Sequence, residues 1–319
     1  MNHYFNAVKV LKYNFLEMKI WLYISAIALL VSCTAENGDI ITAQNTTLQS
    51  YLRSHNLAYE QVGSVFHAIQ SKGYGYKPNI GDTVVFNYTE YLYNGSTPIM
   101  SNVLDTIERY HIDTTFFKPV ASTVVIGQTD LIGGLRDGLM LLQQGEVGDI
   151  YMTSDVGYGA KEAGPVPANS MLHFRIQILY VNGASIQNEK ASISSYISSN
   201  SISATTLQSQ GYYFIPLTQH VVPLVTLGDT VYVHYNCYTL DGTSLSAISV
   251  SNNNLASFVV GKGKPVQGVD LAFLQMASRD TAEVILPSCL AYGNSGLTDI
   301  VGPYQPLRYT VVLDSIKGH

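Results

Sequence analysis

Apolar and polar side chains alternate along two stretches of the chain, residues 172–178 and 307–314. In each stretch every second residue is large and apolar, which is the period of a β-strand with one buried face. A looser alternation of the same kind runs along residues 83–91 and 230–238. These four stretches predict the central strands of sheets that have one face on a core and one more polar face.

Shorter elements surround these central strands. A helix and a connecting strand are predicted ahead of the central strands in each half of the chain. A second short helix is predicted between the middle strands of each half. The connecting strands lie at 64–69 and 212–217, and the helices lie at 47–55, 134–142, 192–199 and 268–276. The pattern predicts the α+β class, with each antiparallel sheet half-wrapped around one short helix.

The chain repeats itself in sequence. GDTVVFNY at residues 81–88 resembles GDTVYVHY at residues 228–235, an offset of 147 positions. Later pairs of similar segments, such as GYG at 157–159 and AYG at 291–293, are offset by 134 or 135 positions. The smaller offset predicts one insertion in the first copy, a loop that we place at residues 96–122.

The order of the repeated segments is the same in both copies, which predicts two tandem domains. We assign residues 40–182 to the first domain and residues 188–319 to the second, each with its preceding helix. The boundary between them, residues 183–187, is polar and without periodicity. A chain of 319 residues is long enough for two domains with separate cores.

Charged residues make up only 13% of the chain, whereas 23 residues are tyrosine. Few charges and many small polar and tyrosine side chains favour an extracytoplasmic protein rich in β-structure over a helical bundle or a disordered chain. The formal net charge is −6, and lysine and arginine do not cluster. A nucleic-acid partner is therefore not expected.

Residues 1–33 have the features of a secretory signal peptide. One lysine follows Met18, an apolar stretch too short to span a bilayer covers residues 20–31, and small Ser32 precedes Cys33. The LVSC ending resembles a bacterial lipobox, in which Cys33 would carry the lipid and begin the mature chain. We therefore expect a lipid-anchored protein of the cell envelope, at the outer membrane and facing the periplasm or the cell surface. The alternative is an ordinary signal with an incidental cysteine.

Two further cysteines, Cys237 and Cys289, remain in the mature chain. An even number of cysteines in an oxidising compartment permits a disulfide bond. Two buried, unpaired thiols are the alternative, and the sequence does not choose between them.

The ordered set of motifs resembles the FK506-binding-protein (FKBP) type of peptidyl-prolyl isomerase. Each copy has a strand ending in NY or HY, a glycine turn, a strand ending at glycine, an apolar pair, a short helix, a YG motif and a final strand with an aromatic residue. No single motif is specific, but two copies in the family order cover nearly the whole mature chain. The resemblance implies a shallow apolar pocket in each domain that grips a proline.

The resemblance also implies which residues line each pocket. In the first domain Tyr158 and Tyr88 are the candidate catalytic residues, with the Tyr158 hydroxyl as a hydrogen-bond donor. The other substrate-binding positions of that domain are Ile99, Leu131, Ile132, Leu135 and Phe174. The matching positions of the second domain are Tyr235, Leu245, Pro265, Val266, Val269, Tyr292 and Tyr309. For each tyrosine the alternative is a core aromatic ring with a polar tip.

Both copies depart from the family pattern. The phenylalanine–aspartate pair of the family reads Ile-Met at residues 99–100 and Leu-Ser at residues 245–246, so neither copy keeps the acid. Asp105 or Asp113, in the insertion, is a possible replacement. The second pocket departs further from the pattern, and we expect the first domain to be the more active one.

The chemistry that the resemblance implies needs no cofactor, metal or titrating base. Rotation about an X–Pro bond meets a barrier of about 18–20 kcal/mol, because the amide C–N bond has partial double-bond character. The planar amide is more polar than the twisted transition state, so a dry apolar pocket with a hydroxyl donor favours the twisted form. His111 and Asp113 do not define a metal site, because two candidate ligands in a predicted loop are too few.

The function expected from the resemblance is an extracytoplasmic peptidyl-prolyl cis–trans isomerase that assists the folding of envelope or secreted proteins. Its partners would be proline-containing polypeptide clients. It would also contact the membrane through its lipid anchor. The alternative is a catalytically silent FKBP-like chaperone or binding lipoprotein, which the missing acid and aromatic residues favour.

Overall fold

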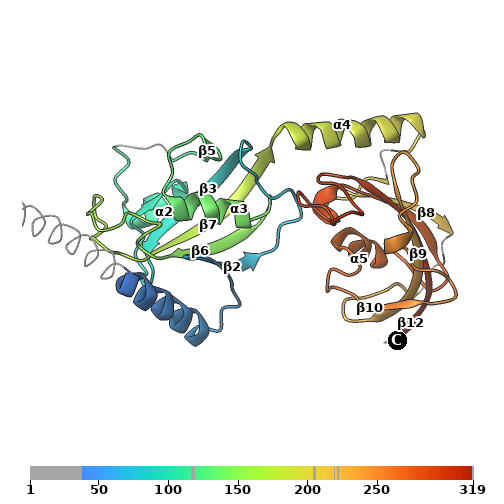
Figure 1. The fold of residues 1–319 in the computed structure, drawn as a ribbon, viewed down its shortest axis with the longest axis horizontal. Helices are drawn as coiled ribbons and strands as arrows, with labels where there is room; N and C mark the ends of the chain where they lie inside the picture. The colour runs from blue at the N-terminus through green and yellow to red at the C-terminus, as the bar shows by residue number, and fades with distance from the viewer. Residues whose placement is uncertain (1–37, 116–118, 204–205, 219, 221–222, 318–319) are drawn as a thin grey trace, which may run out of the picture.

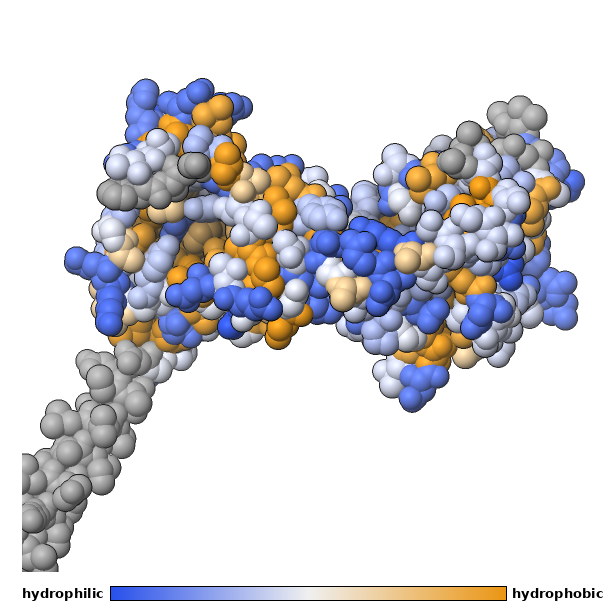
Figure 2. Space-filling model, turned by 90° about the horizontal axis from the view of Figure 1, so that it is seen from above, coloured by the Kyte–Doolittle hydropathy of each residue, from blue (hydrophilic) through white to orange (hydrophobic). Residues whose placement is uncertain are grey.

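The molecule consists of two lobes, each built on its own β-sheet and joined by helix α4 (Ala184–Ser199) (Figure 1). Seen from above, the two lobes meet at a narrower waist (Figure 2). Cys33 and the rest of the predicted signal peptide lie outside the residues that the computed structural model describes, which are 38–115, 119–203, 206–218, 220 and 223–317.

The first domain contains a seven-stranded antiparallel sheet in the order β1-β2-β6-β7-β3-β4, with β5 also paired to β3. Its strands are β1 (Glu60–Val62), β2 (Val65–Ser71), β3 (Thr83–Leu92), β4 (Met100–Ser101), β5 (Ser122–Val125), β6 (Val147–Met152) and β7 (Leu172–Asn182). Its short helices are α2 (Leu104–Tyr110) and α3 (Gly133–Leu141).

The second domain contains a five-stranded antiparallel sheet in the order β10-β9-β12-β11-β8. Its strands are β8 (Tyr213–Thr218), β9 (Thr230–Thr239), β10 (Ala256–Val259), β11 (Thr281–Leu286) and β12 (Leu307–Lys317). Its helix is α5 (Gln267–Phe273), and two 3₁₀ turns are η2 (Ser246–Ile248) and η3 (Ser288–Leu290).

The predicted α+β class, with an antiparallel sheet around one short helix in each of two tandem units, is confirmed. The four alternating stretches of the sequence form the central strands β3, β7, β9 and β12. Along β7 the apolar residues Leu172, Phe174 and Ile176 are buried as the alternation predicts. The buried faces follow from the sequence wherever the period of two holds, and the alternation is interrupted where the register between β3 and β7 and between β9 and β12 shifts.

The first predicted helix is longer than expected, since residues 38–54 are helical and the prediction was 47–55. Its buried residues Leu48 and Leu52 pack with Phe66 of β2 and Tyr151 of β6. This helix therefore covers part of the sheet on the side opposite α3, and both faces of β6 are buried. Among the described residues, no helix is both long enough and apolar enough to cross a membrane.

The domain boundary that we place at residues 183–187 coincides with the start of α4, because Gly183 is the N-cap and the helix begins at the next residue. The sequence indicated a helix only from 192 to 199. The first half of α4 buries Ile186 and Glu189 against parts of the chain that are distant in sequence. Contacts of that kind leave no local hydrophobic period, so the pattern missed the start of the helix.

The insertion at residues 96–122 is not a plain loop, since it contains strand β4 and helix α2. Only Ile107 of α2 is buried, and a single buried residue in two turns gives no amphipathic signal. Within β4, Met100 pairs with Glu90 of β3, which closes the edge of the sheet there.

The central helix of each domain rests on its sheet through a glycine. A Cβ atom added to Gly138 of α3 would lie 2.7 Å from Cγ2 of Ile150, and one added to Gly268 of α5 would lie 2.3 Å from Cδ2 of Leu286. Both distances are shorter than any ordinary carbon–carbon contact. The absence of a side chain at these positions therefore sets how closely the helix approaches the sheet.

Helix α4 ties the two domains together through a buried carboxylate. The Glu189 carboxylate accepts hydrogen bonds from the backbone N–H of Ser288 and, at 2.7 Å, from its hydroxyl. The hydroxyl of Tyr76, from the first domain, also hydrogen-bonds with Glu189. A second hydrogen bond between the domains is made by the side-chain amide of Asn79, which donates to the hydroxyl of Tyr304 at 2.8 Å. Burial raises the pKa of Glu189, and the hydrogen bonds from Ser288 and Tyr76 oppose that rise.

The two remaining cysteines are not joined. Cys237 is buried in the second core and Cys289 is half-buried near the domain junction, and both thiols are free. Of the two alternatives that the sequence left open, the structure therefore has unpaired thiols.

Replacing Gly138 with alanine is expected to lower the free energy of unfolding of the first domain by about 1–3 kcal/mol, because the new methyl group overpacks against Ile150. Gly133→Ala is the matched control in the same helix, since its Cβ would lie 3.7 Å from the nearest heavy atom, the carbonyl oxygen of Val156. Urea denaturation followed by circular dichroism would compare the two variants. Equal stability of both would contradict the close helix–sheet contact.

Candidate active site

The seven predicted pocket residues of the first domain gather in one apolar cluster. Phe174 and Leu135 are buried in the core between the sheet and α3. The other five are half-buried and pack on the rim of that core, and they are Tyr88, Ile99, Leu131, Ile132 and Tyr158. The rings of Tyr88 and Phe174 lie 6.1 Å apart between centroids. An apolar surface that is accessible and backed by a packed core is what binding a prolyl ring requires.

Tyr158 is held by a hydrogen-bonded turn that follows β6. The N–H groups of Gly157 and Gly159 both donate to the carbonyl oxygen of Ser154, at 3.1 and 2.8 Å. Gly159 has a φ of +70°, which a side chain would disfavour. The carbonyl oxygen of Gly159 accepts a further bond from the N–H of Asn169 at 2.8 Å. The turn therefore fixes the tyrosine without using its hydroxyl.

The rim next to Tyr88 is fixed by a buried amide. The Asn102 side chain accepts a hydrogen bond from the N–H of Tyr88 at 2.8 Å and donates to the carbonyl oxygen of Phe86 at 3.1 Å. The N–H of Ile99 donates to the carbonyl oxygen of Glu90 at 2.7 Å. These bonds hold the residues on both sides of β4 against β3, and they place Ile99 beside the pocket.

A buried acid that sequence reasoning missed lies in this cluster. Glu90 is only 1% exposed, and it follows Tyr88 by two residues on the same face of β3. Its neighbours across the strands are Phe174 of β7 and Met100 of β4. The hydroxyl of Tyr158 is the hydrogen-bonding neighbour of the Glu90 carboxyl group, and Oε1 of that carboxyl has no partner in the structure.

The electrostatic state of Glu90 follows from its enclosure. Burial raises the pKa of Glu90 to about 7, and the hydrogen bond with Tyr158 offsets part of the rise. Burial also raises the pKa of Tyr158, and the nearby Glu90 carboxyl raises it further. Both side chains are therefore neutral, or nearly so, in mildly acidic solution.

Neither acid that the sequence offered as a replacement occupies the pocket. Asp105 and Asp113 are both exposed, and the Asp113 carboxylate accepts the backbone N–H of Thr115 at 2.8 Å. The period of two in β3 was the signal that could have found Glu90. Residues 84, 86 and 88 face the core, so residue 90 shares that face.

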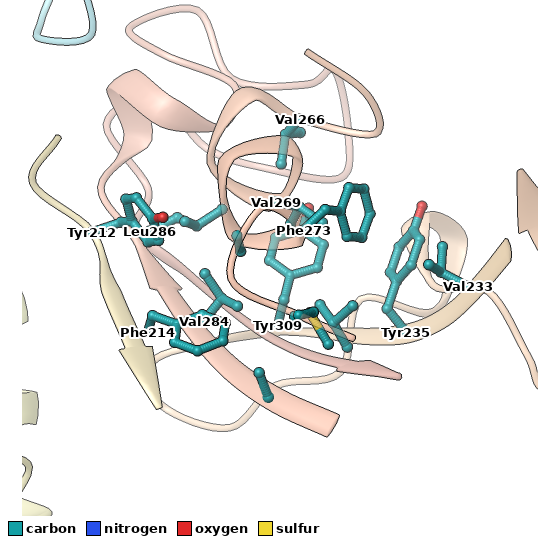
Figure 3. Packing of buried hydrophobic residues seen from close by; sticks show 14 of the residues in the cluster. Tyr212, Phe214, Val233, Tyr235, Val266, Val269, Phe273, Val284, Leu286 and Tyr309 are labelled. Atoms are coloured by element: carbon teal, nitrogen blue, oxygen red, sulfur yellow. The ribbon is translucent and has the colours of Figure 1, made fainter. Parts of the chain in front are cut away.

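The second pocket is more closed than the first. Tyr235, Val266, Val269 and Tyr309 are all at most 5% exposed, whereas Tyr292 is half-buried. Leu245, like Tyr292, packs on the edge of this core. Figure 3 shows Val269 and Phe273 of α5 packed with Tyr309 in the interior of this domain. Phe273, which the sequence did not single out, is fully buried there.

The hydroxyl groups of the second pocket bond to one another. The hydroxyl of Tyr309 hydrogen-bonds with the thiol of Cys237 and with the hydroxyl of Tyr292. Burial raises the pKa of Cys237 to about 11 and that of Tyr235 to about 12, so all these groups are neutral at physiological pH. A hydroxyl that already has partners within the protein is a poorer donor to a substrate.

The mouth of the second pocket faces the first domain. Pro265, Val266 and Tyr292 line a cavity of about 390 Å³ together with Lys72 and Tyr74 of the first domain. Tyr74 also packs on the second core. The first domain thus restricts access to the second pocket.

Positions 90 and 237 are equivalent in the two domains, because their offset of 147 is that of the repeated strand motif. Glu90 lies opposite Phe174, and Cys237 lies opposite Tyr309 at the matching point of the second sheet. At this equivalent position the first pocket therefore has a carboxyl group, whereas the second has a thiol.

Replacing Glu90 with glutamine is expected to stabilise the first domain at alkaline pH but not at acidic pH. The folded pKa of Glu90, about 7, lies above the unfolded value, so the folded state loses stability as the pH rises from about 4.5 to about 7. The loss through this group is at most about 3 kcal/mol and is constant above that range. Melting temperatures of the wild type and of Glu90→Gln, measured across this pH interval, would test the prediction. The same pH dependence of melting temperature in both proteins would contradict it.

Comparison with known proteins places both domains in one family. The family model described as FKBP-type peptidyl-prolyl cis-trans isomerase matches residues 75–179 and 223–314, which make up more than half of the chain. FK506-binding protein 1 of Aspergillus oryzae is 35% identical over 115 residues, which cover 36% of this chain and 95% of that protein.

Longer relatives match across both domains. Human peptidyl-prolyl cis-trans isomerase FKBP10 is 27% identical over 207 residues, which are 65% of this chain and 32% of that protein. Mouse peptidyl-prolyl cis-trans isomerase FKBP9 is 26% identical over 238 residues, which are 73% of this chain and 35% of that protein. The chain thus spans about a third of the length of these two relatives.

A solved structure also aligns over much of the chain. The crystal structure of the three FKBP domains of wheat FKBP73 covers 82% of this chain and 99% of that chain, with a TM-score of 0.32 and 17% identity. The two family matches, the order of the motifs and the clustering of the pocket residues lead to the same conclusion: this chain belongs to the FKBP-type peptidyl-prolyl cis–trans isomerase family.

Proposed function

We propose that this protein is an extracytoplasmic peptidyl-prolyl cis–trans isomerase that acts on proline-containing polypeptides and that its first domain provides most of the activity. The observation that carries the proposal is the accessible apolar rim of the first pocket, with the Tyr158 hydroxyl at its edge. The clients would be envelope or secreted proteins during folding.

The chemistry needs only positioning and desolvation. A prolyl ring that enters the cluster of Tyr88, Leu135 and Phe174 leaves water, which disfavours the polar planar amide relative to the twisted one. The Tyr158 hydroxyl would donate to the carbonyl oxygen next to the rotating bond. The residues proposed for the first pocket are all of the type that this mechanism uses.

A second candidate role, without turnover, is favoured for the second domain by its closed pocket. Tyr309 is only 1% exposed and bonds with Cys237 and Tyr292, and Tyr74 of the first domain packs over the same core. This domain would contribute stability to the whole protein, since a closed pocket limits client binding as much as turnover.

Tyr158→Phe in the full chain is expected to lower kcat/KM for a leucyl-proline peptide about tenfold, because the hydroxyl donor is lost while the ring remains. Tyr292→Phe is the matched control at the equivalent position and is expected to change kcat/KM by less than about twofold, since the second pocket is closed. A protease-coupled isomerisation assay measures both, and thermal denaturation checks the fold. Full activity in Tyr158→Phe, or equal losses in both variants, would contradict the assignment to the first domain.

We also propose that the protein is anchored to the cell envelope through a lipid on Cys33. The support is the sequence alone, an apolar stretch followed by LVSC, since Cys33 lies outside the described residues. A lipid anchor at the outer membrane would hold the two domains where envelope proteins fold.

Cys33→Ser is expected to abolish incorporation of labelled palmitate during expression in a bacterium and to move the protein from the membrane fraction to the soluble fraction. Cys289→Ser is the control cysteine variant, and it is expected to keep both the label and the membrane fraction. Label that persists in Cys33→Ser would show that the lipid is attached at a residue other than Cys33, and it would contradict the proposed anchor.

A further inference from the structure

Glu90 occupies an unusual place for a carboxyl group, in the interior of the first pocket. It is 1% exposed, its Oε1 has no hydrogen-bond partner, and its hydrogen-bonding neighbour is the hydroxyl of Tyr158. The ordinary cost of burying such a group is high unless it is fully paired, so a half-paired carboxyl in a binding site calls for a functional explanation.

We infer that Glu90 is a positioning residue for Tyr158, and that protonation of Glu90 frees the Tyr158 hydroxyl to donate to the carbonyl oxygen of a prolyl substrate. This inference rests on the proposed isomerase function of the first domain. It adds a group that neither the pattern of motifs nor the predicted pocket residues included.

The direction in which the Tyr158 hydroxyl donates depends on the protonation state of Glu90. An ionised Glu90 accepts the Tyr158 O–H in a charge-assisted hydrogen bond, which a neutral substrate carbonyl competes with poorly. A protonated Glu90 instead donates its own O–H to the tyrosine oxygen, so the tyrosine O–H points to the substrate. In that arrangement the carboxyl also strengthens the donor, because hydrogen bonds in a chain polarise one another.

The surroundings supply no opposing charge among the described residues. Phe174 and Met100, on the two neighbouring strands, are uncharged. On its own strand the nearest titratable group on the same face is Tyr88, whose pKa is raised by burial and by Glu90. The basic side chains of β7, His173 and Arg175, alternate to the other face, where both bond to Asp149.

Glu90 therefore changes charge in the neutral range. Burial raises the pKa of Glu90 to about 7, and no ion pair with a described residue lowers it again. The geometry and the protonation equilibrium together predict a first pocket that is more active below neutral pH than above it.

The second domain provides an internal comparison. At the equivalent position Cys237 bonds with Tyr309, and burial raises the pKa of that thiol to about 11. No group at this point of the second pocket titrates near neutrality, so the pH response belongs to the first domain.

The test is the pH profile of isomerisation by the full chain. Wild-type kcat/KM for a leucyl-proline peptide is expected to fall about five- to tenfold between about pH 6 and about pH 8.5, with a midpoint near 7. Glu90→Gln keeps the shape of the side chain and offers an amide N–H to the tyrosine oxygen. It is expected to hold the high, low-pH activity across the whole range.

Asp105→Asn is the matched control, because it makes the same acid-to-amide change at an exposed residue of the insertion. It is expected to retain the wild-type profile. A profile of Glu90→Gln that still falls with a midpoint near 7, or a flat wild-type profile with measurable activity, would overturn the inference.

A second measurement does not depend on turnover. The ¹³Cζ resonance of Tyr158, assigned with Tyr158→Phe, is expected to shift with pH at the midpoint of Glu90 in the wild type and to stay constant in Glu90→Gln. If no variant accelerates isomerisation at any pH, the proposed function fails, and a titrating Tyr158 signal still supports the coupling. A Tyr158 signal that ignores Glu90 would refute the coupling whatever the activity.

Discussion

The fold of each domain depends on the close packing of one short helix against the inner face of an antiparallel sheet. Gly138 and Gly268 make this approach possible, because a Cβ at either position would collide with Ile150 or Leu286. The helix in turn carries Leu135 or Val269 into the core from which each pocket is built. The position of the helix residues that contribute to each pocket is therefore set by the distance between helix and sheet.

Within this common frame, the two domains differ in what lies beneath the pocket tyrosine. The first domain has a carboxyl group at Glu90 and an accessible apolar rim, whereas the second has a thiol at Cys237 and a chain of bonded hydroxyls that ends at Tyr292. A single position on a central strand thus changes the polarity of the site while both cores remain intact. Duplication of a fold permits this divergence, because one copy can supply chemistry while the other supplies binding or rigidity.

The domains are also not independent of each other. Glu189 of α4 satisfies the N–H and hydroxyl of Ser288, and Tyr76 and Asn79 extend the contact from the first domain. Because Tyr74 also packs on the second core, the first domain covers part of the second pocket. The proposed unequal roles of the two pockets are thus consistent with the way that the chain joins them.

The sequence by itself determined the duplication, the fold class, and which face is buried along most of each central strand, because alternation and repeated motifs are local properties of the chain. It also pointed to Tyr88 and Tyr158, which the structure brings into one cluster. Only the tertiary structure revealed the early start of α4, since Glu189 is buried by Ser288, which is distant in sequence. Only the structure placed Glu90 against Tyr158, because the state of a carboxyl group depends on the neighbours that folding brings to it, and these come from other strands and turns.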